Sequence, residues 1–243
     1  SPGDHQKGTV CHYPETVHLR KDVIMILLIR HGEADHHVKE LTGGWTDSAL
    51  TVLGQKQFQQ LADCLAWDFS GRSLPRIVSS DLQRARTGAE IIARKLGAEP
   101  VECFSFLREK NNGKAAGLNK KEALAFYHPP ETGRELDHVN YDGGETRRTF
   151  YERTIQGFRE LEKEGRDLII VSHKGTIQNI LFAWLGLSIE EVAEKQISFD
   201  IRPASLTVLG MNKWGEHAVF ALNDTSYQWK KGPIGIFNFP FGA

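Results

Sequence analysis

Two histidines in the chain each follow a run of apolar residues. His31 comes directly after an arginine at the end of residues 23–29, and His173 follows residues 167–171. A neutral imidazole can attack an electrophilic phosphorus, and a second imidazole can donate to the oxygens of the same group. The pair predicts phosphoryl chemistry if the fold brings the ends of the two runs together.

Two arginines accompany these histidines. Arg30 immediately precedes His31, and Arg84 follows a third short run, residues 76–80; Arg86, two positions further on, is the alternative. A guanidinium group presents N–H donors in a fixed fork that matches the oxygens of a phosphate. Two such groups beside two histidines would form a cationic, donor-rich pocket suited to a phosphate dianion.

A reaction of this kind also needs a proton for the leaving oxygen. Glu109 follows a strand-like stretch at residues 101–104 and is our candidate for this acid, with Glu102 and Glu122 as neighbouring alternatives. A carboxylic acid at the rim of the pocket can protonate the leaving group and later activate water.

The elements that would position these residues alternate along the chain. The continuous apolar runs indicate strands that are covered on both faces, and several helical patterns separate them. This order favours an α/β fold with a mostly parallel central sheet and helices on both faces, in which ligands bind beyond the carboxyl ends of the strands. We expect strands at residues 23–29, 76–80, 101–104, 167–171, 205–209 and 217–222, and helices at 51–67, 82–96, 119–127, 146–163 and 176–185.

Several short motifs in consistent order resemble the histidine phosphatase superfamily, also called phosphoglycerate mutase-like. Arg30-His31-Gly32-Glu33 looks like the motif that names this family, and Ser172-His173 resembles its second-histidine motif. The resemblance covers roughly residues 23–223 and implies the three-layer sandwich of that family. The other segments that carry it are residues 44–54, 79–85 and 143–146.

The resemblance also implies roles for individual residues. His31 would be the phosphorylated nucleophile, Arg30 and Arg84 would bind phosphate, and His173 and Glu109 would complete the catalytic set. We expect a phosphatase that acts on a small phosphorylated substrate through a phosphohistidine, without a metal or an organic cofactor.

Two other functions are weighed against hydrolysis. Residues 117–122 look like a mutase segment, but the space between Glu122 and Gly143 is too short for the insertion that mutases share, which disfavours a phosphoglycerate mutase. A catalytically silent interaction domain is disfavoured because the set of histidines, arginines and acid is intact.

Three further basic residues lie close to the motifs in sequence. Lys174 and His37 are candidate substrate contacts, although for Lys174 a solvated side chain is the better interpretation. His36 and His37 invite a metal interpretation, which we disfavour because no carboxylate or thiolate follows at suitable spacing. A contact at the rim or plain surface is the alternative for both histidines.

Composition limits the remaining possibilities. The 243 residues carry a formal net charge of −1, which does not favour a nucleic-acid or membrane-surface partner. Three cysteines without a CxxC pair, no apolar run long enough for a membrane span and no secretion signal favour a cytoplasmic protein. We expect residues 1–21 to be a tail and residues 22–243 a single domain. The oligomeric state and the role of Phe237, Phe239 and Phe241 (an edge strand, a docked tail or an oligomer contact) stay open.

Overall fold

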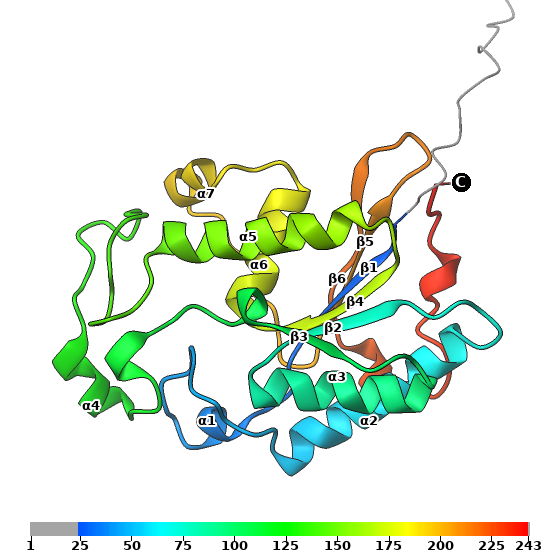
Figure 1. Ribbon diagram of the computed structural model, residues 1–243, viewed down its shortest axis with the longest axis horizontal. Helices are drawn as coiled ribbons and strands as arrows, with labels where there is room; N and C mark the ends of the chain where they lie inside the picture. The colour runs from blue at the N-terminus through cyan, green and yellow to red at the C-terminus, as the bar shows by residue number, and fades with distance from the viewer. Residues whose placement is uncertain (1–23, 243) are drawn as a thin grey trace, which may run out of the picture.

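A six-stranded sheet forms the centre of the molecule in the computed structural model, which describes residues 24–242 (Figure 1). The strand order is β3-β2-β4-β1-β5-β6; β1 to β4 run parallel, whereas β5 is antiparallel to β1 and β6 is antiparallel to β5. The predicted mostly parallel α/β sheet is therefore confirmed, and β5 and β6 form an antiparallel pair at one edge of it. The strands are β1 (Ile26–Arg30), β2 (Arg76–Ser80), β3 (Glu102–Phe104), β4 (Leu168–Ser172), β5 (Leu206–Met211) and β6 (His217–Asp224).

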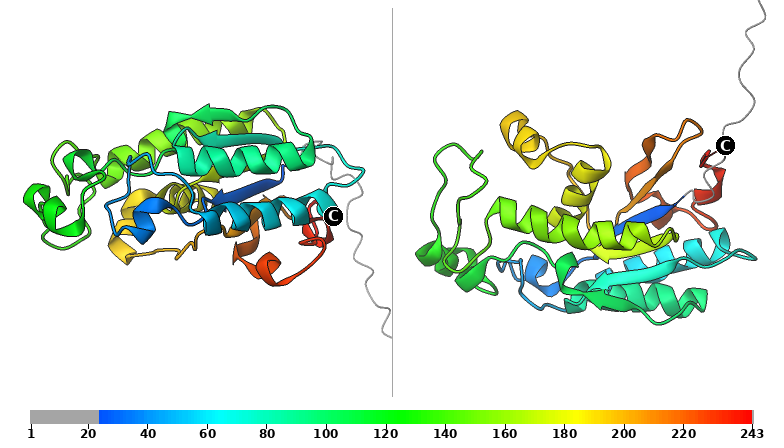
Figure 2. Two further views of the ribbon diagram at one scale, coloured as in Figure 1. Left: turned by 90° about the horizontal axis from the view of Figure 1, so that it is seen from below. Right: turned by 45° about the horizontal axis from the view of Figure 1, so that its top comes forward.

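Helices cover both faces of this sheet, as Figures 1 and 2 show. Side chains alternate between the faces of a strand, so Leu27 and Ile29 of β1 pack toward α2 and α3, whereas Ile26 and Leu28 pack toward α5 and α6. Both faces are apolar, which explains why β1 is a continuous apolar run. The helices are α1 (Asp35–Val38), α2 (Val52–Asp68), α3 (Gln83–Leu96), α4 (Lys120–Ala123), α5 (Arg147–Lys163), α6 (Lys174–Trp184) and α7 (Ile189–Lys195).

Local signals place the ends of the long helices close to where the sequence predicts them. The Thr51 hydroxyl accepts from the Gly54 amide at the start of α2, and the Thr146 hydroxyl accepts from the Thr149 amide at the start of α5. Gly97 ends α3 with a φ of 66°, the left-handed conformation that favours glycine.

Three predictions of local structure need correction. The helix expected at 119–127 is only α4, followed by a 3₁₀ turn at Leu124–Phe126, because Asn119 and Glu122 cap a single turn. Strand β1 begins at Ile26, three residues later than expected, and α6 begins at Lys174, two residues earlier. Helices α1 and α7 were not predicted from the sequence. The predicted tail, residues 1–21, lies outside the described residues.

The C-terminal phenylalanines dock on the molecule, which selects one of the three alternatives for them. Phe237 packs edge-on against Phe69 at the end of α2, and Phe239 and Phe241 contact Phe220 of β6. Within residues 24–242 no helix is long and apolar enough to cross a membrane.

Candidate active site

The register of the sheet brings the two predicted histidines together. Parallel pairing of β1 with β4 places Arg30 opposite Ser172, so His31 and His173 follow at the same level of the carboxyl edge. The His31 amide donates to the Ser172 carbonyl at 2.9 Å, and the two imidazole ring centroids lie 5.1 Å apart. Both side chains are buried.

One nitrogen of His31 is left with its lone pair. The His31 Nδ1 atom lies 2.8 Å from the Gly32 carbonyl oxygen, and because that oxygen can only accept, Nδ1 is the protonated nitrogen. The Nε2 atom of the neutral ring is then an acceptor, and Arg84 Nε donates to it at 3.3 Å. The fold thus places the unprotonated Nε2 atom next to a guanidinium group.

Burial keeps His31 neutral. The pKa of His31 is lowered well below 6.5, first by burial and then by the charges of His173, Arg84 and Arg30. Burial is also the main cause of the lowered pKa of His173. A protonated imidazole has no free lone pair, so the lowered pKa of His31 keeps the lone pair of Nε2 available at neutral pH.

Arg84 lies deep in the site, as predicted, and it also holds a loop. Its Nη2 atom donates to the Gly44 carbonyl at 2.7 Å, and its Nη1 atom donates to the Thr46 carbonyl. Burial lowers the pKa of Arg84 to about 10, which still leaves it charged at neutral pH. Gly44 has a φ of 61°, and an added Cβ would lie 2.7 Å from the Lys110 carbonyl, so this position requires glycine.

Arg30 and His173 each keep a buried nitrogen without a partner among the described residues. Arg30 Nη1 donates to the Ile201 carbonyl at 2.6 Å, whereas Arg30 Nε and His173 Nδ1 have no hydrogen-bond partner. A buried donor that is left unpaired costs free energy, about 1–3 kcal/mol. These two donors are therefore candidates to bind the oxygens of a ligand.

Ser80, at the end of β2, lies beside the other nitrogen of His173. Its Oγ atom is 2.8 Å from His173 Nε2 and accepts from the Leu82 amide at 3.2 Å. A hydroxyl that donates to His173 Nε2 leaves the ring proton of the neutral imidazole on Nδ1, and this is the tautomer that we assign. Ser80 was not predicted from the sequence to be a functional residue. Its place at the end of a buried strand, level with the two histidines, was the available signal.

Glu109 lies in a hollow of about 300 Å³ beside this cluster, as the sequence predicts for the acid. Its Oε2 atom accepts from the Gly175 amide at 3.0 Å, two residues after His173. Its backbone carbonyl accepts from Trp45 Nε1 at 2.8 Å and from Arg153 Nη2 at 3.2 Å. These two side chains, which sequence reasoning missed, tie the Glu109 loop to α5 and to the loop that contains Trp45.

The alternatives to Glu109 and Arg84 have other structural roles. Glu102 forms an ion pair with Arg76 at the edge of the sheet, and Glu122 accepts from the Asn119 amide in a capping box. Arg86 faces outward and pairs with Glu90 along α3. None of the three belongs to the histidine cluster.

His36 and His37 of α1 complete a group of four imidazoles around His31. The rings of His31 and His37 stack with centroids 5.4 Å apart, and His36 is buried with its Nδ1 atom 2.6 Å from Ser48 Oγ. Burial lowers the pKa of His36 to about 3 and that of His37 to about 4. Within the described part of the chain, no group of three or more His, Cys, Asp or Glu side chains is arranged to hold a metal ion.

Lys174 forms an ion pair at the surface of the molecule. Its Nζ atom forms an ion pair with the exposed Asp200, and its side chain is 40% exposed. This pairing agrees with the interpretation as a solvated lysine, and substrate contact by Lys174 or His37 stays a prediction.

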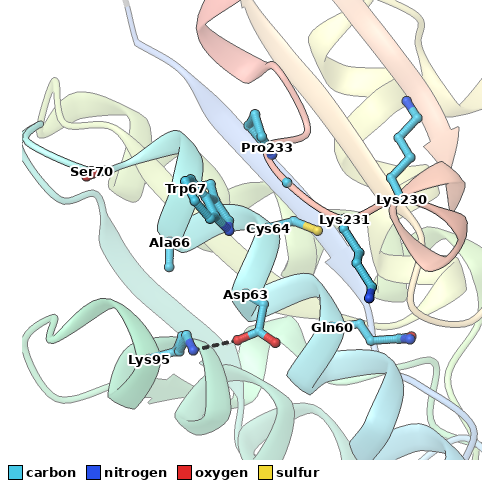
Figure 3. A pocket seen from close by; sticks show the side chains of 11 residues that line it. Gln60, Asp63, Cys64, Ala66, Trp67, Ser70, Lys95, Lys230, Lys231 and Pro233 are labelled. Carbon is cyan, nitrogen blue, oxygen red and sulfur yellow. Dashed lines mark ion pairs between the residues drawn. The ribbon is translucent and has the colours of Figure 1, made fainter.

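Another hollow, of about 1000 Å³, lies between α2 and the C-terminal segment (Figure 3). It contains neither His31 nor His173. Asp63 and Lys95, which form an ion pair, both line this hollow. Burial raises the pKa of Cys64, the one thiol in its lining. A raised pKa disfavours the reactive thiolate, so this hollow lacks an activated nucleophile.

Comparison with known proteins agrees with the geometry. The model of the histidine phosphatase superfamily (branch 1) matches residues 26–225. Phosphoglycerate mutase-like protein 4 of Arabidopsis thaliana is 29% identical over 65% of this chain and 70% of its own length. A broad-specificity phosphatase of Saccharomyces cerevisiae is 30% identical over 68% of this chain and 71% of its own.

A solved structure of another protein has a similar fold. Mycobacterial glucosyl-3-phosphoglycerate phosphatase superposes with a TM-score of 0.65 and 25% sequence identity, covering 82% of this chain and 99% of its own. The matched region of the family contains both histidines, both arginines and Glu109. The chain belongs to the histidine phosphatase superfamily.

Proposed function

We propose that this protein hydrolyses a small phosphomonoester through a phosphohistidine on His31, without a metal ion. The observation that carries the proposal is the neutral His31, whose unprotonated Nε2 atom lies beside Arg84 and is flanked by the unpartnered donors of Arg30 and His173. The phosphatase names of two relatives, in yeast and mycobacteria, support the same reaction class.

In the first step, His31 Nε2 attacks phosphorus as the bond from phosphorus to the leaving oxygen breaks. Glu109, in its protonated form, gives its proton to that oxygen, and the alcohol departs. Arg30, Arg84 and His173 donate to the phosphoryl oxygens, where charge gathers in the transition state. The Gly32 carbonyl stabilises the ring, which keeps its Nδ1 proton and becomes cationic on phosphorylation.

In the second step, water attacks the phosphohistidine. Glu109, now a carboxylate, takes a proton from the water as its oxygen bonds to phosphorus and the bond from phosphorus to Nε2 breaks. Inorganic phosphate leaves, and both His31 and Glu109 return to their starting protonation states. The proposed residues supply the nucleophile, the acid and the charge compensation, so the cycle balances without a cofactor.

The direct test is hydrolysis of p-nitrophenyl phosphate in excess chelator, with wild type and His31→Ala side by side. We expect wild type to turn over and the variant to lose at least about 1000-fold in kcat/KM, the scale typical for loss of a nucleophile. Activity of His31→Ala equal to wild type would overturn the assignment of the nucleophile, and loss of wild-type activity in chelator would overturn metal independence.

A mutase is the second candidate, favoured by the name of the Arabidopsis relative. A mutase must keep the phosphohistidine until the product is phosphorylated, so it requires a bisphosphorylated primer. Formation of 2-phosphoglycerate from 3-phosphoglycerate, with added 2,3-bisphosphoglycerate, would support this candidate. We expect release of inorganic phosphate instead.

A further inference from the structure

The hollow that contains Glu109 also contains two cationic side chains. Lys110 follows Glu109 in the chain, and Arg147 is the first residue of α5; both are partly shielded from solvent. If Glu109 protonates the leaving oxygen, the part of the substrate that departs must occupy this hollow. The residues that line this hollow therefore indicate the chemistry of the leaving group.

Arg147 lacks a partner. Outside the histidine cluster, it is the one arginine within residues 24–242 that is shielded from solvent and forms neither an ion pair nor a side-chain hydrogen bond. Its neighbour Arg148 shows the contrast, because it pairs with both Asp137 and Glu190. Burial lowers the pKa of Arg147, and no carboxylate offsets this effect. A shielded charge without a counter-ion is costly unless a ligand supplies one.

Lys110 lies close enough to Arg147 for their two positive charges to interact. Its Nζ atom donates to the neutral amide oxygen of Asn140 at 2.9 Å, and within the described residues it forms no ion pair within 4 Å. The pKa of Lys110 is lowered first by burial; Arg147 lowers it further, whereas Glu145 and Glu109 raise it. Two like charges that share a hollow repel each other, and an anion between them would relieve this repulsion.

The remaining carboxylate of the hollow does not fill this role. Glu135 lines the same space, but its Oε1 atom accepts from the amide and the hydroxyl of Thr132. Its Oε2 atom is buried without a partner and is not within ion-pair distance of Lys110 or Arg147. The hollow thus offers two cations that form no ion pair, together with one free acceptor, which matches a small acid that also carries a hydroxyl group.

We propose that Lys110 and Arg147 form a subsite for a second oxyanion, a carboxylate or a phosphate, on the leaving group of the substrate. This proposal rests on the proposed function, because it takes the leaving group to lie beside Glu109. The volume of about 300 Å³ is at the small end of the range for ligand pockets, so it suits a small leaving group. The substrate class is then a small phosphorylated acid or a small bisphosphate.

Two matched pairs of esters test the subsite. For the carboxylate, kcat/KM for 3-phosphoglycerate is compared with that for glycerol 3-phosphate, which has an alcohol in place of the carboxylate. For the phosphate, propane-1,3-diol bisphosphate is compared with its monophosphate. In at least one of the two pairs, we expect the ester that carries the second oxyanion to have the higher kcat/KM. The difference should be at least about tenfold, the scale of a charge-assisted contact.

Variants then locate the preference. Arg147→Gln should bring the ratio of the two kcat/KM values toward one, chiefly through KM for the anionic ester, and Lys110→Gln should lower the ratio as well. Arg148→Gln is the matched control, because Arg148 is the next residue and pairs outside the hollow; it should leave the ratio unchanged. No preference in wild type, or a preference that survives Arg147→Gln, would overturn the subsite.

Failure of the subsite and failure of the proposed function are separable. If wild type hydrolyses p-nitrophenyl phosphate but shows no preference within either pair, the subsite is wrong and the phosphatase stands. If wild type hydrolyses no ester, calorimetric binding of 3-phosphoglycerate and of the bisphosphate decides. Binding of either ligand that is at least about tenfold weaker to Arg147→Gln than to wild type supports the subsite. Affinities that are the same in Arg147→Gln and wild type for both ligands contradict it.

Discussion

Single hydrogen atoms decide what the imidazoles of this site can do. The Gly32 carbonyl oxygen fixes the proton of His31 on Nδ1, and we assign the Ser80 hydroxyl as the donor to His173 Nε2, which puts the ring proton of His173 on Nδ1. The first arrangement leaves an acceptor to attack phosphorus. The second leaves a donor to bind an oxygen.

Ser80→Ala should therefore weaken catalysis through His173. Without the hydroxyl, His173 Nε2 loses its donor, and the ring proton is no longer held on the nitrogen that faces the substrate. We expect kcat/KM to fall about tenfold, the scale of one lost buried hydrogen bond, and Ser80→Thr to restore most of it.

Ser79→Ala is the matched control for this experiment. Ser79 is equally buried, but its hydroxyl donates to the carbonyls of Ser80 and Val171 and not to His173. A loss for Ser79→Ala equal to that for Ser80→Ala would show a structural effect. The ¹⁵N shifts of His173 should report the change of tautomer in Ser80→Ala alone.

The sequence predicts the residues to which the proposed chemistry assigns a role, but not those that orient them. His31, His173, Arg30, Arg84 and Glu109 stand in recognisable motifs and lie where the motifs imply. Ser80, Trp45 and Arg153 act through tertiary contacts across the sheet and between loops, and residue type alone does not reveal such contacts. Arg147 is informative only because the structure leaves it unpaired.

At the scale of elements, the short helix α1 adds His36 and His37 to the cluster. The pKa of His36 is lowered from 6.5 to about 3, so the folded protein keeps it neutral while the unfolded chain takes up a proton below pH 6.5. The unfolded state then binds more protons, and stability falls as pH decreases from 6.5 toward 3.

His36→Asn tests this linkage. At pH 5 the neutral His36 should cost about 2 kcal/mol of stability relative to pH 7, from about 1.4 kcal/mol per pH unit below 6.5. The variant should lose less free energy of unfolding between pH 7 and pH 5 than wild type does, by about that amount. Urea unfolding at both pH values measures the difference, and parallel losses in the two proteins would contradict the lowered pKa.

Elements were predicted well where local signals and burial agree. Continuous apolar runs mark β1, β2 and β4. In helices α2, α3 and α5 the apolar residues recur at helical spacing, and a capping residue marks one end of each helix. The segment 119–127 has a cap but no continuing apolar face, so one helical turn forms and then a 3₁₀ turn. Helix α7 is short, and the Ser188–Glu191 capping box was its available signal.

At the scale of the whole molecule, one buried carboxylate ties the C-terminal segment to α2. Asp68 accepts from the backbone amides of Ile234, Gly235 and Ile236 at 2.7, 2.9 and 3.1 Å. Its partners lie more than 160 residues away in the chain. These contacts seat Ile236 and the phenylalanines beyond it on the core.

Asp68→Ala should lower the free energy of unfolding by about 3 kcal/mol, because three amides lose a charged acceptor. Asp63→Ala on the same helix is the control; it removes an exposed ion pair with Lys95 and should change stability by less than about 1 kcal/mol. Hydrogen exchange should accelerate at residues 234–241 in Asp68→Ala alone. Equal effects of the two variants would contradict the anchor.

A single domain over residues 22–243 stays a prediction for the whole chain. The sheet is continuous from β3 to β6, and its two faces share the same strands. We expect chemical unfolding to be one transition that coincides for tryptophan fluorescence and circular dichroism. Two separated transitions would indicate independent units.

The central claim is that His31 carries the phosphoryl group during turnover. The most direct measurement is rapid quenching of the enzyme with a phosphorus-labelled ester in base, where a phosphohistidine is stable, followed by mass spectrometry of the peptide that contains His31. We expect label on His31 in wild type, loss of that label on acid treatment, and no labelled peptide in His31→Ala. Label on another residue, or unimpaired turnover by His31→Ala, would contradict the account.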